Sequence, residues 1–284
     1  MMRLRPGAPG EGEPTAAGAG ALCWRLLRDP PGEGAWNMAV DEAIASAVGE
    51  GAVGPTLRLY GWLRPTVSLG FLQRGSVGVD RGACRRRGIP VVRRITGGRA
   101  VLHGEELTYS VALPLHGPWG ELSVAESFRA LNGGLLGMLR RLGVAATLGS
   151  CGSAEAAGGQ SGLCFLARRM PAILVAGRKL IGSAQRRAAS WLLQHGSVLV
   201  ELDETLHRDL FPGWPRGGAA EVTCLREILG RRPGGEELIA AMGGAWEAEV
   251  GGPLHPGRLT PGERQEALRL MECRYATASW TWQR

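Results

Sequence analysis

Apolar residues recur at helical spacing in one long segment near the middle of the chain. Between residues 123 and 142 their period is close to 3.6, which predicts an amphipathic helix: Val124, Phe128, Leu131, Leu135, Met138, Leu139 and Leu142. A second helix is predicted to begin at Asn37, a residue type that caps helices, because acidic residues follow in the first turns. Helices are also predicted near 221–229, 235–250 and 260–273, the last opened by the capping-box pattern Thr260-Pro261-Gly262-Glu263.

Shorter apolar runs bounded by glycine and proline predict strands. They lie just after Leu22 and at 56–62, 66–71, 90–95, 106–114, 144–148, 172–176, 179–186 and 190–202, with a short basic helix at 80–87. The last three runs are joined by tight turns, which predicts consecutive antiparallel strands. Because strands fill the body and helices are segregated from them, we predict an α+β fold with a largely antiparallel or mixed sheet flanked by helices.

The first 21 residues are rich in Gly, Pro, Ala and Glu. We expect a disordered tail over 1–21 and one folded domain over 22–284, with a helical C-terminal part. No apolar run approaches the ~18–20 residues that a membrane span needs, and the tail lacks the apolar core of a secretion signal. Neither a membrane protein nor a secreted one is therefore expected.

Charge and cysteine usage narrow the function further. The net charge of +7 suits an acidic partner, but basic residues come in pairs and triplets, and aromatic residues make up only 6% of the chain. Nucleic-acid binding is therefore not expected. Six cysteines occur without a C-x-x-C pair or clustered histidines, which argues against a metal site and a disulfide framework. Reduced cysteines in the cytoplasm are the default expectation.

Lys179 is the only lysine in a chain whose lysine and arginine residues total 33. Replacement of lysine by arginine is tolerated at most surface positions, but not where a compact ammonium on a flexible stem is needed. A lysine that survived by accident on a strand is the competing explanation. We favour a functional role for Lys179.

Four other segments carry residues suited to chemistry. The turn Thr96-Gly97-Gly98-Arg99 would let backbone N–H groups approach a carbonyl or an anion, although a glycine pair between strands is more often a plain turn. Small residues inside a strand, at Gly182-Ser183-Ala184-Gln185, often mark the close approach of a ligand. Cys164 follows a glycine-rich loop that also holds Cys151, and His195 stands in an apolar strand. For a single cysteine or histidine in such a place, a structural role is the commoner one.

Together these residues resemble the lipoate and biotin protein ligase superfamily along nearly the whole chain from 22 to 284. The segments that carry the resemblance are 37–43, 65–70, 93–103, 106–110, 177–186 and 194–197. The turn at 96–99, the segment 106–110 and the segment 274–280 look most like the octanoyltransferases that use an active-site cysteine. The resemblance implies a catalytic domain that passes octanoate from acyl carrier protein to a lysine of the glycine cleavage H protein or another lipoyl domain, in lipoate biosynthesis and without a cofactor.

The resemblance also implies roles for single residues. Cys164 falls at the position of the nucleophile and Lys179 at the position of the superfamily's lysine. A cation there would lower the thiol pKa from about 8.5 and polarise the acyl carbonyl. We expect Lys179 to be half-exposed, so that arginine would abolish transfer there without unfolding the protein. The implied substrate-binding residues are Arg94, Gly97, Gly98, Arg99, His103, Gly182, Ser183, Gln185 and His195.

Several assignments stay open on the sequence alone. The acceptor amine must lose a proton, and either His103 or His195 could take it. The chain departs from the family pattern at 165–171, after Cys164, where basic and apolar residues replace an acidic residue and a Pro-Ser-like step. An ATP-dependent lipoate–protein ligase shares the glycine turn and the lysine but needs no cysteine, and glycine instead of Arg99 would favour it. Two further function classes compete with these enzymes, namely a non-catalytic carrier-binding protein and a basic RNA-binding protein.

Overall fold

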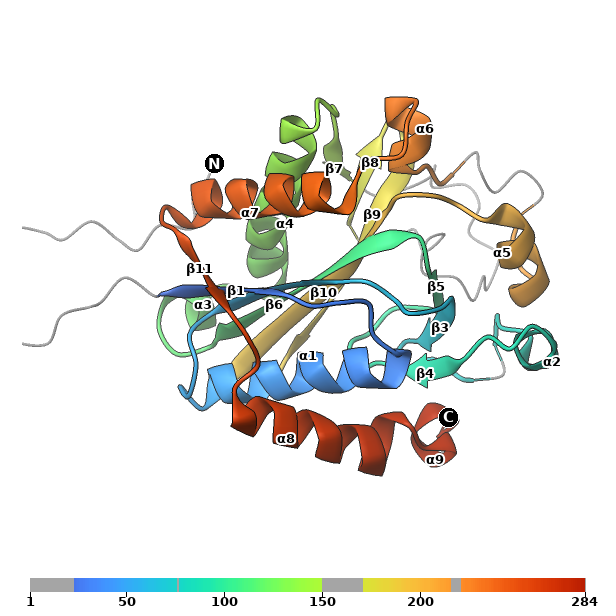
Figure 1. Cartoon of the computed structure of the whole chain (residues 1–284), viewed down its shortest axis with the longest axis horizontal. Helices are drawn as coiled ribbons and strands as arrows, with labels where there is room; N and C mark the ends of the chain where they lie inside the picture. Colours follow the sequence, from blue (N-terminus) through green and yellow to red (C-terminus); the bar gives the residue numbers. More distant parts are fainter. Residues whose placement is uncertain (1–22, 76, 150–170, 216–220, 284) are drawn as a thin grey trace, which may run out of the picture.

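The computed structural model describes residues 23–75, 77–149, 171–215 and 221–283 (Figure 1). Two sheets lie among the helices: an eight-stranded mixed sheet in the order β11-β1-β2-β6-β10-β9-β8-β7, and a three-stranded sheet in the order β4-β3-β5. The strands are β1 (Trp24–Arg28), β2 (Thr56–Tyr60), β3 (Thr66–Leu69), β4 (Val91–Arg93), β5 (Val101–His103), β6 (Glu106–Pro114), β7 (Thr147–Gly149), β8 (Ala172–Val175), β9 (Arg178–Arg187), β10 (Trp191–Leu199) and β11 (Leu254–Gly257).

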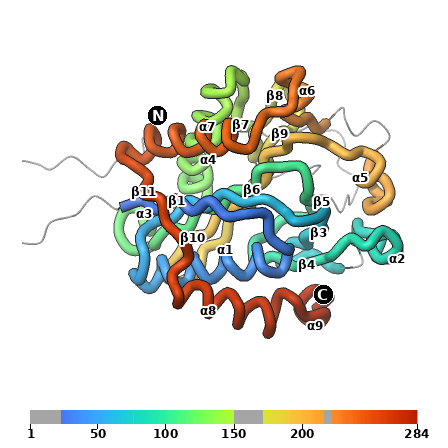
Figure 2. The backbone as a smooth tube through the Cα atoms, in the orientation of Figure 1, coloured from blue at the N-terminus to red at the C-terminus, as the bar shows by residue number. Residues whose placement is uncertain are grey.

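Helices cover both faces of the large sheet (Figures 1 and 2). On one face α1 contacts β6, β10 and α8, and on the other α4 packs against α7. The predicted α+β architecture is confirmed. The helices are α1 (Gly34–Gly49), α2 (Arg81–Arg86), α3 (Pro118–Glu121), α4 (Val124–Arg141), α5 (Glu204–Leu210), α6 (Leu225–Leu229), α7 (Gly235–Val250), α8 (Pro261–Leu270), a π-helix (Met271–Tyr275) and α9 (Ala278–Thr281).

The long helix predicted from apolar spacing is α4, and its ends have clear causes. Ser123 caps it, because its hydroxyl accepts from the Glu126 N–H at 3.2 Å while the Glu126 carboxylate accepts from the Ser123 N–H at 2.9 Å. Gly134 lets α4 approach α7, since a Cβ atom there would collide with the Trp246 ring. The fully buried Trp246 side chain thereby closes the core on this face.

The predicted start of the first helix is wrong. Helix α1 begins at Gly34, and Asn37 lies inside its first turn. The Asn37 amide instead donates to the carbonyl oxygens of Gly32 at 3.2 Å and Gly61 at 3.0 Å. A buried side chain that joins two separate chain segments was thus taken for a local cap. Strands β5 and β11 and helices α3 and α9, each of three or four residues, were also not predicted.

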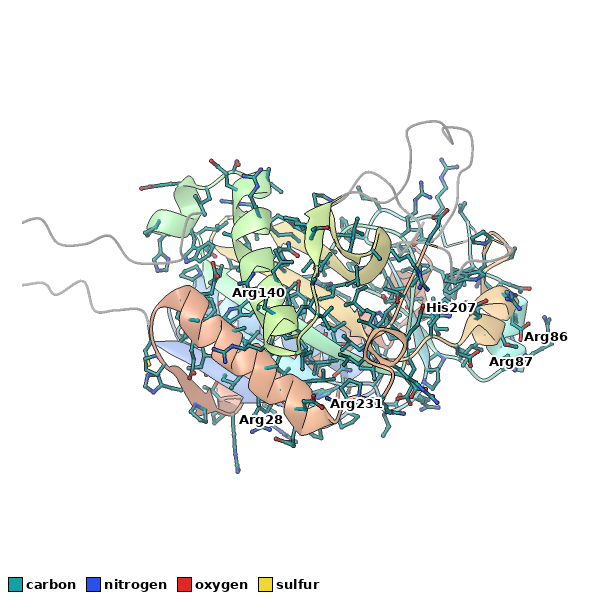
Figure 3. The ribbon with its side chains drawn as sticks, turned by 90° about the horizontal axis from the view of Figure 1, so that it is seen from above. Arg28, Arg86, Arg87, Arg140, His207 and Arg231 are labelled. Atoms are coloured by element: carbon teal, nitrogen blue, oxygen red, sulfur yellow. The ribbon has the colours of Figure 1, made fainter. Side chains whose placement is uncertain are left out.

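The exposed arginines labelled in Figure 3 are spread over several elements. Arg28 ends β1, Arg86 and Arg87 lie at α2, and Arg140 lies in the last turn of α4. These four arginines therefore lie on three different elements. Within the described residues, no helix combines the length and apolar character needed to cross a membrane. The expected tail over 1–21 lies outside the described residues.

Candidate active site

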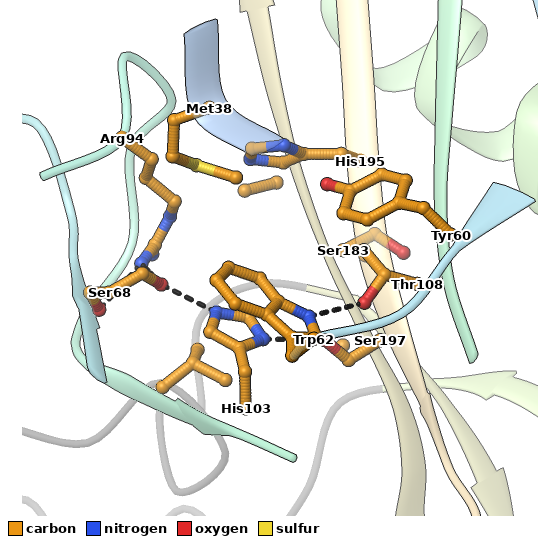
Figure 4. Close-up of a pocket in the computed structure, with 14 residues that line it drawn as sticks. Met38, Tyr60, Trp62, Ser68, Arg94, His103, Thr108, Ser183, His195 and Ser197 are labelled. Atoms are coloured by element: carbon orange, nitrogen blue, oxygen red, sulfur yellow. Dashed lines mark hydrogen bonds between the residues drawn. The ribbon is translucent and has the colours of Figure 1, made fainter. Parts of the chain in front are cut away.

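A narrow cavity lies between the two sheets, beside the first half of α1 (Figure 4). The space between its lining atoms, the open mouth included, is about 430 Å³. Strands β2, β3, β5, β6, β9 and β10 all contribute to its wall. The lining residues are Met38, Tyr60, Trp62, Ser68, Arg94, Val101, His103, Thr108, Gly182, Ser183, Ala184, His195, Gly196 and Ser197.

Arg94 fastens the glycine turn to the wall of the cavity. Its buried guanidinium donates to the carbonyl oxygens of Gly97 and Arg99, both at 2.8 Å. The same group donates to the Ser68 carbonyl at 3.0 Å and to the Ser68 hydroxyl at 2.9 Å. The turn also packs closely on Gly70, where a Cβ atom would collide with the carbonyl oxygen of Gly98. The turn therefore presents fixed backbone to whatever enters the cavity.

Asp41 is the centre of a buried polar network behind the cavity. It is 1% exposed and accepts hydrogen bonds from Arg58 at 2.7 Å, from Tyr60 at 2.8 Å and from Ser110 at 2.8 Å. Burial raises the pKa of Asp41. The hydrogen bond from His195 and the positive charge of Arg58 lower it by more than this, so the pKa lies below its ordinary value of 3.8. Asp41 is therefore a carboxylate anion whose role is to orient its neighbours.

His195 is held at both ring nitrogens. Its Nδ1 lies 3.0 Å from Asp41 Oδ2, and its Nε2 lies 2.6 Å from Thr96 Oγ1. Burial lowers the pKa of His195 below 6.5 and outweighs the attraction of Asp41. A neutral ring that bonds the first residue of the glycine turn positions that turn. It could accept a further proton only by giving up the bond to Thr96.

His103 belongs to a second, separate network. Its Nε2 lies 2.7 Å from Ser68 Oγ, and its Nδ1 lies 2.8 Å from Glu106 Oε1. The Trp62 indole stacks on the imidazole, with ring centroids 3.9 Å apart and 11° between the planes. Glu106 Oε1 also accepts from Ser197 at 2.6 Å. Burial raises the pKa of Glu106, but its electrostatic interaction and hydrogen bond with His103 and the hydrogen bonds from Ser197 and Thr108 lower it more, to below 4.5.

The pKa values of two buried histidines predict how the stability of the protein depends on pH. The pKa values of His195 and His207 are both lowered by burial from 6.5, so the folded protein binds fewer protons than the unfolded chain at pH values just below 6.5. The free energy of unfolding should therefore keep its full value above pH 6.5. It should decrease as the pH drops below 6.5, by at most about 1.4 kcal/mol per pH unit for each histidine. Urea unfolding between pH 7.5 and pH 5.5 measures this. His195→Gln should show a shallower decline, and an unchanged decline would contradict the assignment.

Lys179 lies near the start of β9 and is 4% exposed, so the expectation of a half-exposed position is wrong. Its N–H donates to the Glu221 carbonyl at 2.8 Å, and its carbonyl accepts from the Thr223 N–H at 3.0 Å. This second backbone segment covers the edge of β9 and removes Lys179 from water. Gly182, which lines the cavity, follows three residues later on the same strand. Cys164 lies outside the described residues, as does Cys151, so the convergence of Cys164 with Lys179 stays a prediction.

The structure brings five of the nine expected substrate-binding residues to the cavity wall, namely Arg94, His103, Gly182, Ser183 and His195. Gly97, Gly98 and Arg99 form the turn that Arg94 fastens. Gln185 is not part of the described lining. Its side-chain amide nitrogen donates to the Gln194 side-chain oxygen at 3.2 Å, and its side-chain oxygen accepts from the Ser127 hydroxyl of α4 at 3.2 Å.

Several residues of the site were not expected, above all Asp41, Trp62, Ser68 and Glu106. A signal for Asp41 and Glu106 was present, since each is an acidic residue next to apolar residues in a predicted helix or strand. Such residues need a partner when they are buried. Trp62 and Ser68 gave no such signal, because their role depends on which strands become neighbours.

Comparison with known proteins agrees with this architecture. Residues 33–247 match the family model of the lipoyl protein ligase A/B catalytic domain. The octanoyltransferase LipM of Kyrpidia tusciae is 40% identical over 272 residues, covering 92% of this chain and 99% of that protein. The octanoyltransferase LipM of Symbiobacterium thermophilum is 39% identical, covering 90% of this chain and 97% of that protein.

Solved structures of lower identity share the fold. A bi-partite lipoate protein ligase from Thermoplasma acidophilum, studied with its E2 lipoyl domain, aligns with a TM-score of 0.76 at 22% identity, over 92% of this chain and 96% of that one. A lipoate-protein ligase A bound with ATP aligns with a TM-score of 0.75 at 24% identity, over 92% of this chain and 98% of that one. Similarity at this level describes the backbone architecture only.

Proposed function

The chain belongs to the lipoyl protein ligase A/B catalytic domain family, and from this premise we propose that it is an octanoyltransferase, an acyltransferase that attaches octanoyl groups to lipoyl-accepting proteins in lipoate biosynthesis. The observation that carries the proposal is the 40% identity to an octanoyltransferase over nearly the full length of both chains. The cavity supports it, because a narrow space with an aromatic and aliphatic wall suits a slender acyl chain.

For the donor we propose octanoyl-acyl carrier protein, and for the acceptor the glycine cleavage H protein or another lipoyl domain. A carrier thioester and a protein lysine are chemically matched, since amide formation from a thioester needs no further activation. The net charge of +7 favours encounter with acidic carriers.

We propose Cys164 as the nucleophile. The Cys164 thiol loses its proton and attacks the thioester carbonyl as a thiolate. The carrier sulfur leaves and takes up that proton, and the octanoyl group stays on the Cys164 sulfur. The acceptor amine then attacks this second thioester, the Cys164 sulfur leaves, and the proton lost by the amine neutralises it. A covalent intermediate lets two bulky carriers use one site in turn.

We propose that the Lys179 ammonium stabilises the charge that develops on the acyl carbonyl oxygen in both steps. Its burial supports this role, because an ammonium shielded from water acts more strongly on a nearby oxyanion. The remaining expected binding residues act around the acyl chain. Arg94 and His195 fix the turn at 96–99 from two sides, and His103, Gly182 and Ser183 form the wall.

The direct test is transfer from octanoyl-acyl carrier protein to a purified lipoyl domain without ATP, followed by intact mass spectrometry of both proteins. We expect one octanoyl group on the lipoyl domain and a transient octanoyl adduct on the enzyme. A parallel reaction with free lipoate and ATP tests whether the chain is a ligase. Modification only in that reaction would replace the proposal, and no adduct in either would support a non-catalytic carrier-binding protein.

A further inference from the structure

Ser68, His103 and Glu106 form a continuous hydrogen-bonded row on three strands. Ser68 lies on β3, His103 on β5 and Glu106 at the start of β6. The Ser68 hydroxyl lies 2.7 Å from His103 Nε2 (Figure 4). The Glu106 carboxylate lies 2.8 Å from His103 Nδ1. A hydroxyl at one ring nitrogen and a carboxylate at the other are the arrangement that activates a serine as a nucleophile.

The surroundings hold this row in one geometry. Glu106 Oε1 accepts from the hydroxyls of Ser197 and Thr108, both at 2.6 Å, so the carboxylate is fixed. Trp62 stacks on the imidazole and prevents it from turning. With the carboxylate at Nδ1, the ring carries its proton there and offers the Nε2 lone pair to Ser68. Arg94 donates to the same hydroxyl at 2.9 Å and would stabilise negative charge on its oxygen.

Access separates this row from the similar one formed by Thr96, His195 and Asp41. Ser68 lines the cavity, where the proposed function places an acyl chain. Ser68 and Thr96 are both 0% exposed, but Thr96 is not part of the described lining. Among the described residues, Ser68 therefore carries the hydroxyl that both bonds the Nε2 atom of a histidine and lies in the cavity wall.

We propose that Ser68 is a second acyl acceptor in this cavity, and that the protein slowly hydrolyses octanoyl thioesters through an octanoyl-serine intermediate. The Ser68 oxygen attacks the thioester carbonyl while His103 takes the hydroxyl proton. The thiol leaves with that proton, and an oxygen ester forms. Water then attacks the ester with His103 again as base, which releases octanoate and restores the Ser68 hydroxyl.

Such an activity would discharge acyl groups that reach the cavity when no acceptor protein arrives. This proposal shares one premise with the proposed function, namely that an octanoyl group occupies the cavity. The two activities can be told apart, because transfer is measured on the lipoyl domain and hydrolysis as release of free thiol. Loss of one does not require loss of the other.

The experiment uses the full-length Cys164→Ala variant, so that no thioester can form at that position. It is incubated with the octanoyl thioester of N-acetylcysteamine, and free thiol is followed with a chromogenic disulfide. We expect thiol release above the buffer rate and an octanoyl adduct on the peptide that contains Ser68. The adduct should survive neutral hydroxylamine and be lost in alkaline hydroxylamine, as an oxygen ester is.

The deciding comparison adds Ser68→Ala to this variant. It should lower thiol release by at least about 100-fold, the low end of the effect of general acid–base catalysis, because His103 then has no hydroxyl to activate. Ser127→Ala is the matched control, because Ser127 is also fully buried but lies on α4 away from the cavity. If Ser68→Ala fails to fold, Ser68→Cys decides, since its adduct should become labile to neutral hydroxylamine. Equal thiol release with and without the Ser68 hydroxyl, or an adduct at any other residue, overturns the proposal.

Discussion

Cys164→Ala should reduce octanoyl transfer to a lipoyl domain by at least about 10⁴-fold, the scale of loss when a catalytic nucleophile is removed. Without the thiol, the acceptor amine would have to attack the carrier thioester while both proteins are docked. Transfer is measured as the rate at which the lipoyl domain gains the mass of one octanoyl group. The wild-type enzyme should also carry an adduct that neutral hydroxylamine removes, and the variant should not.

Cys151→Ala is the matched control, since Cys151 lies on the same glycine-rich segment and competes for the same role. It should transfer octanoate at close to the wild-type rate. If Cys151→Ala is inactive and Cys164→Ala is active, Cys151 is the nucleophile and Cys164 is not. If neither substitution slows transfer, a cysteine thioester is not part of the reaction.

Much of the fold could be predicted because it is encoded locally. The spacing of Leu131, Leu135 and Met138 predicted α4, and all three side chains are fully buried. The strand predicted at 106–114 matches β6 to the residue, because Thr108 and Ser110 alternate with apolar neighbours at the two-residue period of a strand. The error at Asn37 has the opposite cause. Its amide is satisfied by Gly32 and Gly61, and a partner 24 residues away leaves no mark on the neighbouring sequence.

The candidate site could be predicted only where one segment carries several of its features. The glycine turn and the small residues of β9 were recognised because each is a compact motif. Ser68 and His103 are 35 residues apart, and they meet because β3 pairs with β5 in a register that sets Thr66 opposite His103. A shift of that register by one residue would turn these side chains to opposite faces. Their contact is therefore a property of the fold.

The second large effect is expected for Lys179→Arg, which should lower transfer by about 10²–10³-fold, the cost of losing one well-placed oxyanion donor. The charge is kept, but the planar guanidinium is longer and cannot occupy the position of a compact ammonium. Lys179 is 4% exposed, so the added bulk should also destabilise the protein, and activity must be compared per folded molecule. Single-turnover acylation of Cys164 is the measurement, because it isolates the first chemical step.

Lys179→Met separates the charge from the packing, because methionine is unbranched and fits a buried lysine stem without added volume. If the ammonium stabilises the developing oxyanion, Lys179→Met should fold with near-native stability and still lose transfer to the same extent as Lys179→Arg. A Lys179→Met variant that transfers octanoate at the wild-type rate would show that the stem alone is needed. The retention of one lysine among 32 arginines would then reflect packing at the start of β9 and not the chemistry of the acyl carbonyl.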